Sequence, residues 1–242
     1  MSNRTATVME RIIHIYTYMP IIESKFKIVF FDNDGTLNTG RSTWRYLHEH
    51  FGTWEPYGRL LQEKLFRDRT PYDAYAREIT AMWKGIHRDK FLEKLREVEI
   101  RKGAVELING LKSSGLKIGV LSSGFTLWRD VWRERAGLEF DYYIANELIF
   151  DEDGNCTGEI IMQMTDNVAG MNKGDWVERI SNELGIPYEE RVFVGDGWGD
   201  VPGFKKCGLT IAVDPNMPEV NEEADFVIGG DEIMKVLEII ST

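Results

Sequence analysis

The sequence predicts an α/β protein whose core is a doubly wound, Rossmann-like parallel sheet, joined by a helical cap and a small β-hairpin. Short apolar runs such as Ile28–Phe31 do not alternate with polar residues, which is typical of strands buried on both faces of a parallel sheet. Most of these runs alternate with amphipathic helical segments. The stretch 41–102 contains only helical patterns, which predicts a helical module inserted between parts of the sheet.

Length, charge and composition restrict the partners of the chain. With 242 residues it can form a core domain plus a smaller module, and its formal net charge of −11 has the wrong sign for non-specific binding to nucleic acids. Cys156 and Cys207 lie far apart, which favours unpaired thiols in a reducing cytoplasm. The apolar run 12–22 is interrupted by Pro20 and is shorter than the roughly 20 residues that span a membrane, so we expect no membrane segment.

The expected domains follow the chain in order. Residues 1–25 form an N-terminal extension, which we expect to pack on the domain or on an oligomer partner, so that the chain could form a homodimer. The catalytic core comprises 26–40 and 103–242, and the cap comprises 41–102. Within the cap we expect helices near 44–48, 60–66, 72–83 and 91–95.

A βα rhythm resumes after the cap. We expect helices over 104–114, 127–135, 173–184 and 233–240, and strands over 117–121, 142–145, 191–194, 209–213 and 226–228. Between them, Asp153-Gly154 separates two apolar runs, 148–150 and 158–164, which is typical of a β-hairpin.

The first strand ends in two acidic residues, Asp32 and Asp34. In open α/β sheets, ligands bind beyond the carboxyl ends of the strands, so these carboxylates stand where a reacting group would bind. Two carboxylates this close stay ionised when a cation neutralises them, and Mg²⁺ prefers such oxygen ligands. A carboxylate beside Mg²⁺ can attack a phosphoryl group and form an aspartyl-phosphate. The alternative is an ordinary surface turn after a core strand.

Further polar residues stand at later strand and helix boundaries. Ser122 follows the second strand, Lys173 opens a helix, and Asp196 and Asp200 lie in a glycine-rich loop after a later strand. Each of these features alone is compatible with a plain loop, helix start or turn. Because parallel strands end at one edge of the sheet, we expect the groups to meet there.

Together these groups suit phosphoryl transfer, which depends on positioning and charge stabilisation. We expect Asp32 to be the nucleophile and Asp34 the general acid and base. Ser122 would hold phosphate oxygens and Lys173 would neutralise developing charge. Asp196 would complete the metal shell, with Asp200 orienting it from behind.

The motifs Asp32-x-Asp34-Gly-Thr-Leu, Ser122-Ser-Gly, Lys173-Gly-Asp and Gly-Asp196-Gly-x-x-Asp resemble those of the haloacid dehalogenase-like hydrolases. The chain is most similar to the phosphoserine phosphatase-like branch, whose C1 helical cap lies between the first and second motifs. Ser122-Ser-Gly-Phe also resembles the Ser-Gly-Gly-Phe of that branch, so Ser122 and Ser123 are both candidates for phosphate binding.

The resemblance implies a Mg²⁺-dependent phosphatase with an aspartyl-phosphate intermediate. The Asp32 carboxylate, the Asp34 backbone carbonyl and the Asp196 carboxylate would bind the metal. The substrate would be a small phosphorylated metabolite. Two alternatives share the same phosphorylated Asp32: a phosphotransferase or phosphomutase, and a non-enzymatic phospho-acceptor.

Three residues are candidates for the substrate pocket because the chain departs from the branch near them. Arg41 stands where the branch carries a glutamate that holds a substrate amino group, and Arg41 would favour an anionic or sugar-like group. Arg77 lies close to the position of a cap arginine of the branch. Trp198 follows the fourth-motif aspartate near the place of an asparagine, and its ring could form a wall of the pocket.

Overall fold

The computed structural model describes residues 22–67, 71–164, 171–215 and 217–241. The expected N-terminal extension, 1–25, therefore lies almost entirely outside the described residues. None of the helices in the described ranges is long and apolar enough to cross a membrane.

The seven strands of the described chain form one sheet in the order β4-β3-β2-β1-β5-β6-β7. Neighbouring strands are parallel, except that β4 runs antiparallel to β3. The strands are β1 Ile28–Phe31, β2 Lys117–Phe125, β3 Tyr142–Phe150, β4 Cys156–Ile161, β5 Arg191–Gly195, β6 Leu209–Val213 and β7 Phe226–Ile228. This arrangement confirms the predicted α/β fold with a doubly wound sheet.

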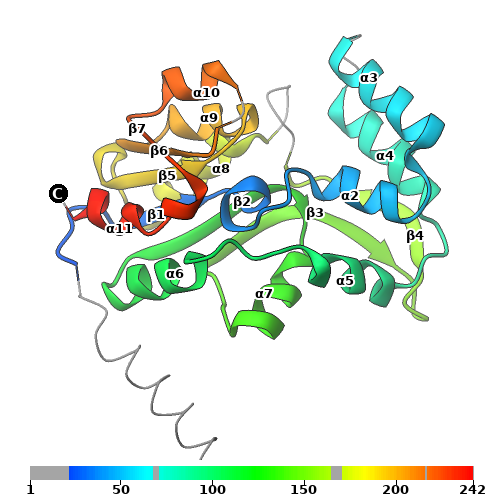
Figure 1. Cartoon of the computed structure of the whole chain (residues 1–242), viewed down its shortest axis with the longest axis horizontal. Coiled ribbons are helices and arrows are strands. Elements are labelled where there is room, and N and C mark those ends of the chain that lie inside the picture. The colour runs from blue at the N-terminus through cyan, green and yellow to red at the C-terminus, as the bar shows by residue number, and fades with distance from the viewer. Residues whose placement is uncertain (1–21, 68–70, 165–170, 216, 242) are drawn as a thin grey trace, which may run out of the picture.

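Helices cover both faces of the sheet (Figure 1). The helices are α2 Thr43–His50, α3 Arg59–Arg67, α4 Tyr72–Met82, α5 Arg88–Glu97, α6 Ala104–Ser113, α7 Trp128–Ala136, α8 Lys173–Leu184, α9 Val201–Phe204, α10 Pro218–Glu223 and α11 Lys235–Ile240. The apolar core divides in the same way. Helices α8, α9 and α10 pack on one face, and α6, α7 and α11 pack on the other.

Strand β1 lies at the centre of the sheet, between β2 and β5. All four of its residues are fully buried, as the unbroken apolar run predicts. Ile28 and Phe30 belong to the core under α8, whereas Val29 and Phe31 belong to the core under α6. The alternation of side chains along the strand therefore contributes residues to both cores, and Asp32 follows at the carboxyl end of the strand.

Two strands are longer than predicted. We expected β2 to end at Leu121 and β3 at Ala145, but β2 continues to Phe125 and β3 runs unbroken to Phe150. The register between β2 and β3 shifts between Leu121 and Phe125, and β3 then pairs with β4. The Ser-Ser-Gly segment therefore lies between two paired parts of β2 and stays extended, which its turn-forming residues did not indicate.

The cap segment, residues 41–102, contains helices α2 to α5. Its core is aromatic, with Trp83 lying 5.8 Å from Trp44, 5.7 Å from Phe91 and 5.7 Å from Phe125 between ring centroids. Helix α4 lies against β4, where the Thr80 hydroxyl donates to the carbonyl of Gly158 at 3.2 Å. The cap segment thus packs on the extended ends of β2 to β4.

Candidate active site

The turn after β1 places Asp32 against the next strand of the sheet. Its backbone N–H donates to the carbonyl of Val194 at 2.9 Å, which extends the pairing of β1 with β5 by one residue. Gly35 follows with φ of +81°, a conformation that favours glycine. A Cβ atom on Gly35 would lie 2.2 Å from Asp196 Oδ2, so the glycine allows the two loops to approach each other.

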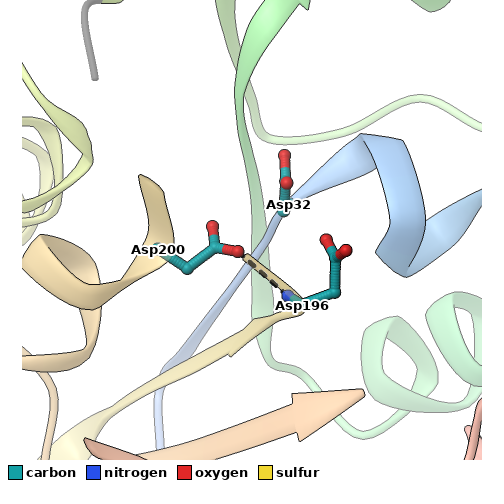
Figure 2. A group of neighbouring side chains, drawn as sticks. All are labelled: Asp32, Asp196 and Asp200. Carbon is teal, nitrogen blue, oxygen red and sulfur yellow. Dashed lines mark hydrogen bonds between the residues drawn. The ribbon is translucent and has the colours of Figure 1, made fainter. Parts of the chain in front are cut away.

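The loop after β5 is held by Asp200. Its Oδ2 atom accepts hydrogen bonds from the backbone N–H groups of Asp196 and Gly197, both at 2.9 Å. Figure 2 shows the carboxylates of Asp32, Asp196 and Asp200 extending from β1 and from this loop into one region. Asp200 therefore fixes the backbone that carries Asp196.

Lys173 joins the two loops through its ammonium group. Nζ lies 2.9 Å from Asp32 Oδ1 and 2.6 Å from Asp200 Oδ1, and the side chain is buried. Lys173 is the first residue of α8, whose start is fixed by a capping box between Asn172 and Asp175. This helix start delivers a charged group to the sheet edge from a distant part of the sequence.

The buried carboxylates of the site repel one another, and this repulsion shows in their pKa values. Burial raises the pKa of Asp32 well above its ordinary value, and Asp200, Asp196 and Asp34 raise it further against the opposing effect of Lys173. Burial and the nearby Asp200 raise the pKa of Asp196 to about 7. Burial opposes the charge of Lys173, but Asp200 and Asp32 outweigh it and raise the pKa of the ammonium group. An added cation would relieve this repulsion.

The donor set fits a hard divalent cation. One carboxylate oxygen from each of Asp32, Asp196 and Asp200 lies within 4.8 Å of the others, and all three residues are buried. Oxygen-only donors of this kind are those that Mg²⁺ and related cations prefer. Both oxygens of Asp200 are held by buried donors, Oδ1 by Lys173 and Oδ2 by two backbone N–H groups. Lys173 contacts Asp32 at Oδ1, and the ion-pair partner of Asp196 is the half-exposed Arg41, so Asp32 and Asp196 are the better placed ligands.

Asp34 is held by a separate set of donors. The Asn33 and Asn38 amides donate to its Oδ1 at 2.9 and 3.1 Å, and the backbone N–H of Thr43 donates to its Oδ2 at 2.6 Å. Trp128 in turn donates to the Thr43 hydroxyl at 2.9 Å. The Asp34 carboxylate is therefore fixed in orientation without a contact to Lys173.

These groups form the floor of a cavity of about 270 Å³ between the sheet edge and the cap segment. The floor consists of charged residues: Asp32, Asp34, Lys173, Asp196 and Asp200. The wall is aromatic and polar, and it includes Arg41, Ser42, Trp44, Gln62, Tyr72, Tyr75, Ser123, Trp198 and Met217. The cavity is thus highly charged at the bottom and less polar above.

Comparison with known proteins decides the family. A family model described as haloacid dehalogenase-like hydrolase matches residues 29–205. The chain belongs to the haloacid dehalogenase-like hydrolases. It is 31% identical to the phosphoserine phosphatase of Methanocaldococcus jannaschii over 90% of this chain and 100% of the relative. It is also 26% identical to that of a Polaromonas species over 90% and 91% of the two chains.

Solved structures agree with this family. A substrate-bound phosphoserine phosphatase complex superposes with a TM-score of 0.74 at 29% identity, covering 90% of this hydrolase and all of that chain. A phospho-aspartyl intermediate analogue of phosphoserine phosphatase superposes with a TM-score of 0.70 at 29% identity, covering 87% and 98%. Together, the matches indicate that this hydrolase is a phosphatase and confirm the predicted resemblance.

The Ser-Ser-Gly segment places its two serines differently. The Ser122 hydroxyl is buried and accepts a hydrogen bond from the backbone N–H of Gly124 at 3.0 Å. Ser123 lines the cavity, and its carbonyl accepts from Trp44 Nε1 at 2.8 Å and from Asn146 Nδ2 at 2.9 Å. Of the two candidates for phosphate binding, Ser123 is the one on the cavity wall.

The structure brings two of the three pocket candidates to the cavity. Arg41 Nη1 lies 3.0 Å from Asp196 Oδ2, and Trp198 lies on the wall with 47% of its surface exposed. Arg77 is exposed on α4 and does not line this cavity. The buried residues of α4 include Tyr72, Tyr75, Ala76 and Ile79, so the helical turn directs Arg77 away from them.

Sequence reasoning missed several residues that position the floor. Thr43 is one, although Ser42 before it is a recognisable helix N-cap. Arg101 is another: it donates through Nε to the carbonyl of Thr36 at 2.7 Å, donates to the carbonyl of Gly35, and pairs with Asp214 at 3.0 Å. No local pattern marks Arg101, because its partners are distant in the sequence.

Proposed function

We propose that this hydrolase is a Mg²⁺-dependent phosphatase that cleaves a small phosphomonoester through an aspartyl-phosphate on Asp32. The observation that carries the proposal is the convergence of Asp32 and Asp196 beside Lys173 on the floor of one cavity. A relative solved as a phospho-aspartyl intermediate analogue supports the same chemistry. Asp32, Asp196 and the backbone carbonyl of Asp34 would hold Mg²⁺, which would neutralise charge on the phosphoryl group.

In the first step, a carboxylate oxygen of Asp32 attacks phosphorus and the bond from phosphorus to the alcohol oxygen breaks. Asp34 donates its proton to that leaving oxygen, so the alcohol departs neutral. Lys173 stays charged beside Asp32 and stabilises the negative charge of the phosphoryl oxygens. The N–H and hydroxyl groups around Ser123 would orient the phosphoryl group.

In the second step, Asp34 accepts a proton from a water molecule, and that water attacks the phosphorus of the aspartyl-phosphate. The bond between phosphorus and Asp32 breaks, which releases phosphate and restores both carboxyl groups. The hydrogen bonds from Asn33, Asn38 and Thr43 keep Asp34 in one orientation for both proton transfers.

Hydrolysis of p-nitrophenyl phosphate with Mg²⁺ tests the proposal. We expect Asp32→Asn to abolish phosphate release, because an amide is a far weaker nucleophile than a carboxylate. Asp34→Asn should instead let phosphorylated protein accumulate, which intact-protein mass spectrometry would detect. Asp89→Asn, at a side chain that is 78% exposed on α5, is the matched control.

Each alternative has a distinct result. Transfer of the phosphoryl group to an added alcohol or sugar without release of free phosphate would indicate a phosphotransferase or mutase. A long-lived phosphorylated Asp32 in the unmodified protein, with no turnover, would indicate a phospho-acceptor. Full turnover by the Asp32→Asn variant would contradict all three hypotheses, because each of them requires a phosphorylated Asp32.

A further inference from the structure

Arg41 lines the cavity, and its side chain is 51% exposed. Its Nη1 donates to Asp196 Oδ2 and to the backbone carbonyl of Asp214, both at 3.0 Å. Lys173, the other cation among the described lining residues, is buried between Asp32 and Asp200. Arg41 is therefore the partly exposed cation of the described lining.

Among the lining residues that the structure describes, every carboxylate belongs to the floor and is engaged there. Above the floor, the described wall offers aromatic rings, hydroxyl groups and one amide, among them Trp44, Gln62, Tyr72, Tyr75 and Trp198. For the alcohol part of a substrate, the described wall thus supplies one guanidinium and no carboxylate.

This distribution of charge discriminates between substrates. An ammonium group in the alcohol part would lose water, would find no carboxylate on the described wall, and would lie near a guanidinium. A carboxylate could instead accept charge-assisted, bidentate hydrogen bonds from Arg41. We propose that Arg41 makes this site select phosphomonoesters whose alcohol part carries an anionic group over those whose alcohol part carries an ammonium group. The selectivity rests on the proposed phosphatase function.

The pairing of Arg41 with Asp196 is compatible with this role. A divalent cation held by Asp32 and Asp196 would compete for the Asp196 carboxylate and repel the guanidinium, so Arg41 should release Asp196 in the loaded site. The arginine side chain is long and partly exposed, and it can turn into the cavity.

Two phosphomonoesters of similar size, whose alcohol parts carry groups of opposite charge, test the proposal: phosphoglycolate, which carries a carboxylate, and phosphoethanolamine, which carries an ammonium group. With Mg²⁺, we expect kcat/KM for phosphoglycolate to exceed that for phosphoethanolamine by about tenfold or more, the size expected for a hydrogen bond between charged groups. The difference should lie mainly in KM. The reference is p-nitrophenyl phosphate, whose alcohol part carries no charge.

Substitutions at Arg41 should change the ratio in a defined order. Arg41→Gln should bring the two esters to within about threefold of each other, and Arg41→Glu should reverse the preference. Arg45→Gln removes an arginine that is 56% exposed, pairs with Glu49 and does not line the cavity, so it should keep the wild-type ratio. Equal rates in the wild type, or an unchanged ratio in Arg41→Gln, would overturn the proposal.

A binding measurement separates this inference from the proposed function. Calorimetry on the Asp32→Asn variant should give a smaller Kd for phosphoglycolate than for phosphoethanolamine, and adding Arg41→Gln should remove the difference. If the wild type fails to cleave p-nitrophenyl phosphate, the proposed function is wrong, and the calorimetry still decides the charge preference. Tighter binding of phosphoethanolamine would refute the inference even in an active phosphatase.

Discussion

The backbone N–H of Thr43 donates a hydrogen bond to Asp34 Oδ2 at 2.6 Å. Thr43 is the first residue of α2 and belongs to the cap segment, whereas Asp34 belongs to the turn after β1. The cap segment therefore contributes a main-chain donor to the floor of the cavity. The start of a helix is well suited to this, because its first N–H groups have no partner within the helix.

Replacing Thr43 by proline should remove this donor with little change to the helix. Proline is tolerated at the first helical position, and Ser42 before it has the extended conformation that proline requires, with φ of −162° and ψ of 110°. We expect kcat for p-nitrophenyl phosphate to fall by about tenfold, since a hydrogen bond to a charged group contributes about 1.5 kcal/mol.

Thr43→Ala is the matched control for that variant. It keeps the N–H and loses the γ-methyl group and the hydroxyl that accepts from Trp128, so it should lower stability by about 1 kcal/mol but keep most of kcat. Equal activity of the proline and alanine variants would argue against a role for this N–H.

Gly35→Ala should weaken binding of a divalent cation and destabilise the protein. The added Cβ atom would lie 2.2 Å from Asp196 Oδ2, on a residue whose φ is +81°. Gly52→Ala is a matched control, because its φ is +68° and no atom lies within 4 Å of the added Cβ. In urea unfolding, both substitutions should lower the free energy of unfolding by about 1 to 2 kcal/mol because of backbone strain. Only Gly35→Ala should also raise the Kd for Mg²⁺ in calorimetry. The same Kd in both variants would mean that the close approach of the two loops is not required.

The floor of the site could be predicted from the sequence because topology determines where strands end. Asp32 and Asp196 directly follow strands of one parallel sheet, and their side chains converge although they lie far apart in sequence. The position of Lys173 could be predicted as well, since the helix that it begins has a recognisable N-cap. Strand exits and caps are local signals, so a single sequence is enough to identify them.

The wall of the cavity could be predicted less well, since it depends on pairing between distant segments. Nothing local shows that β2 continues past Leu121, and that continuation is what directs Ser123 rather than Ser122 to the cavity. Arg77 is different, because the stripe of Tyr72, Ala76 and Ile79 at helical spacing already indicated that Arg77 points away from the packed face.

His48 should make the stability of the cap segment depend on pH. Its imidazole is buried, Nδ1 lies 2.6 Å from the Thr53 hydroxyl, and Nε2 has no hydrogen-bond partner in the described chain. Burial lowers the pKa of His48 from 6.5 to about 4 in the folded state. Between those two values the unfolded chain binds the proton more readily, so stability should be full above about pH 6.5 and should fall as the pH decreases towards 4.

Denaturant unfolding at several pH values measures this effect. The free energy of unfolding should decrease by up to about 3 kcal/mol between pH 6.5 and 4 through His48 alone. The His48→Asn variant should be less stable at neutral pH but should show a smaller decrease over the same range. His87→Asn, at an exposed histidine, controls for loss of an imidazole. An identical pH dependence in wild type and His48→Asn would contradict the assignment.

Lys173→Met should be strongly destabilising because it leaves Asp32 and Asp200 buried without a positive partner. Removing one member of a buried ionic group costs about 3 to 5 kcal/mol, which urea unfolding at neutral pH without added metal would measure. Adding Asp200→Asn to this variant should restore part of the loss, since it removes one unpaired charge while an amide oxygen can still accept from the N–H groups of Asp196 and Gly197. If the double variant were no more stable than Lys173→Met, the loss would come from packing of the lysine chain, and the electrostatic account of the floor would be wrong.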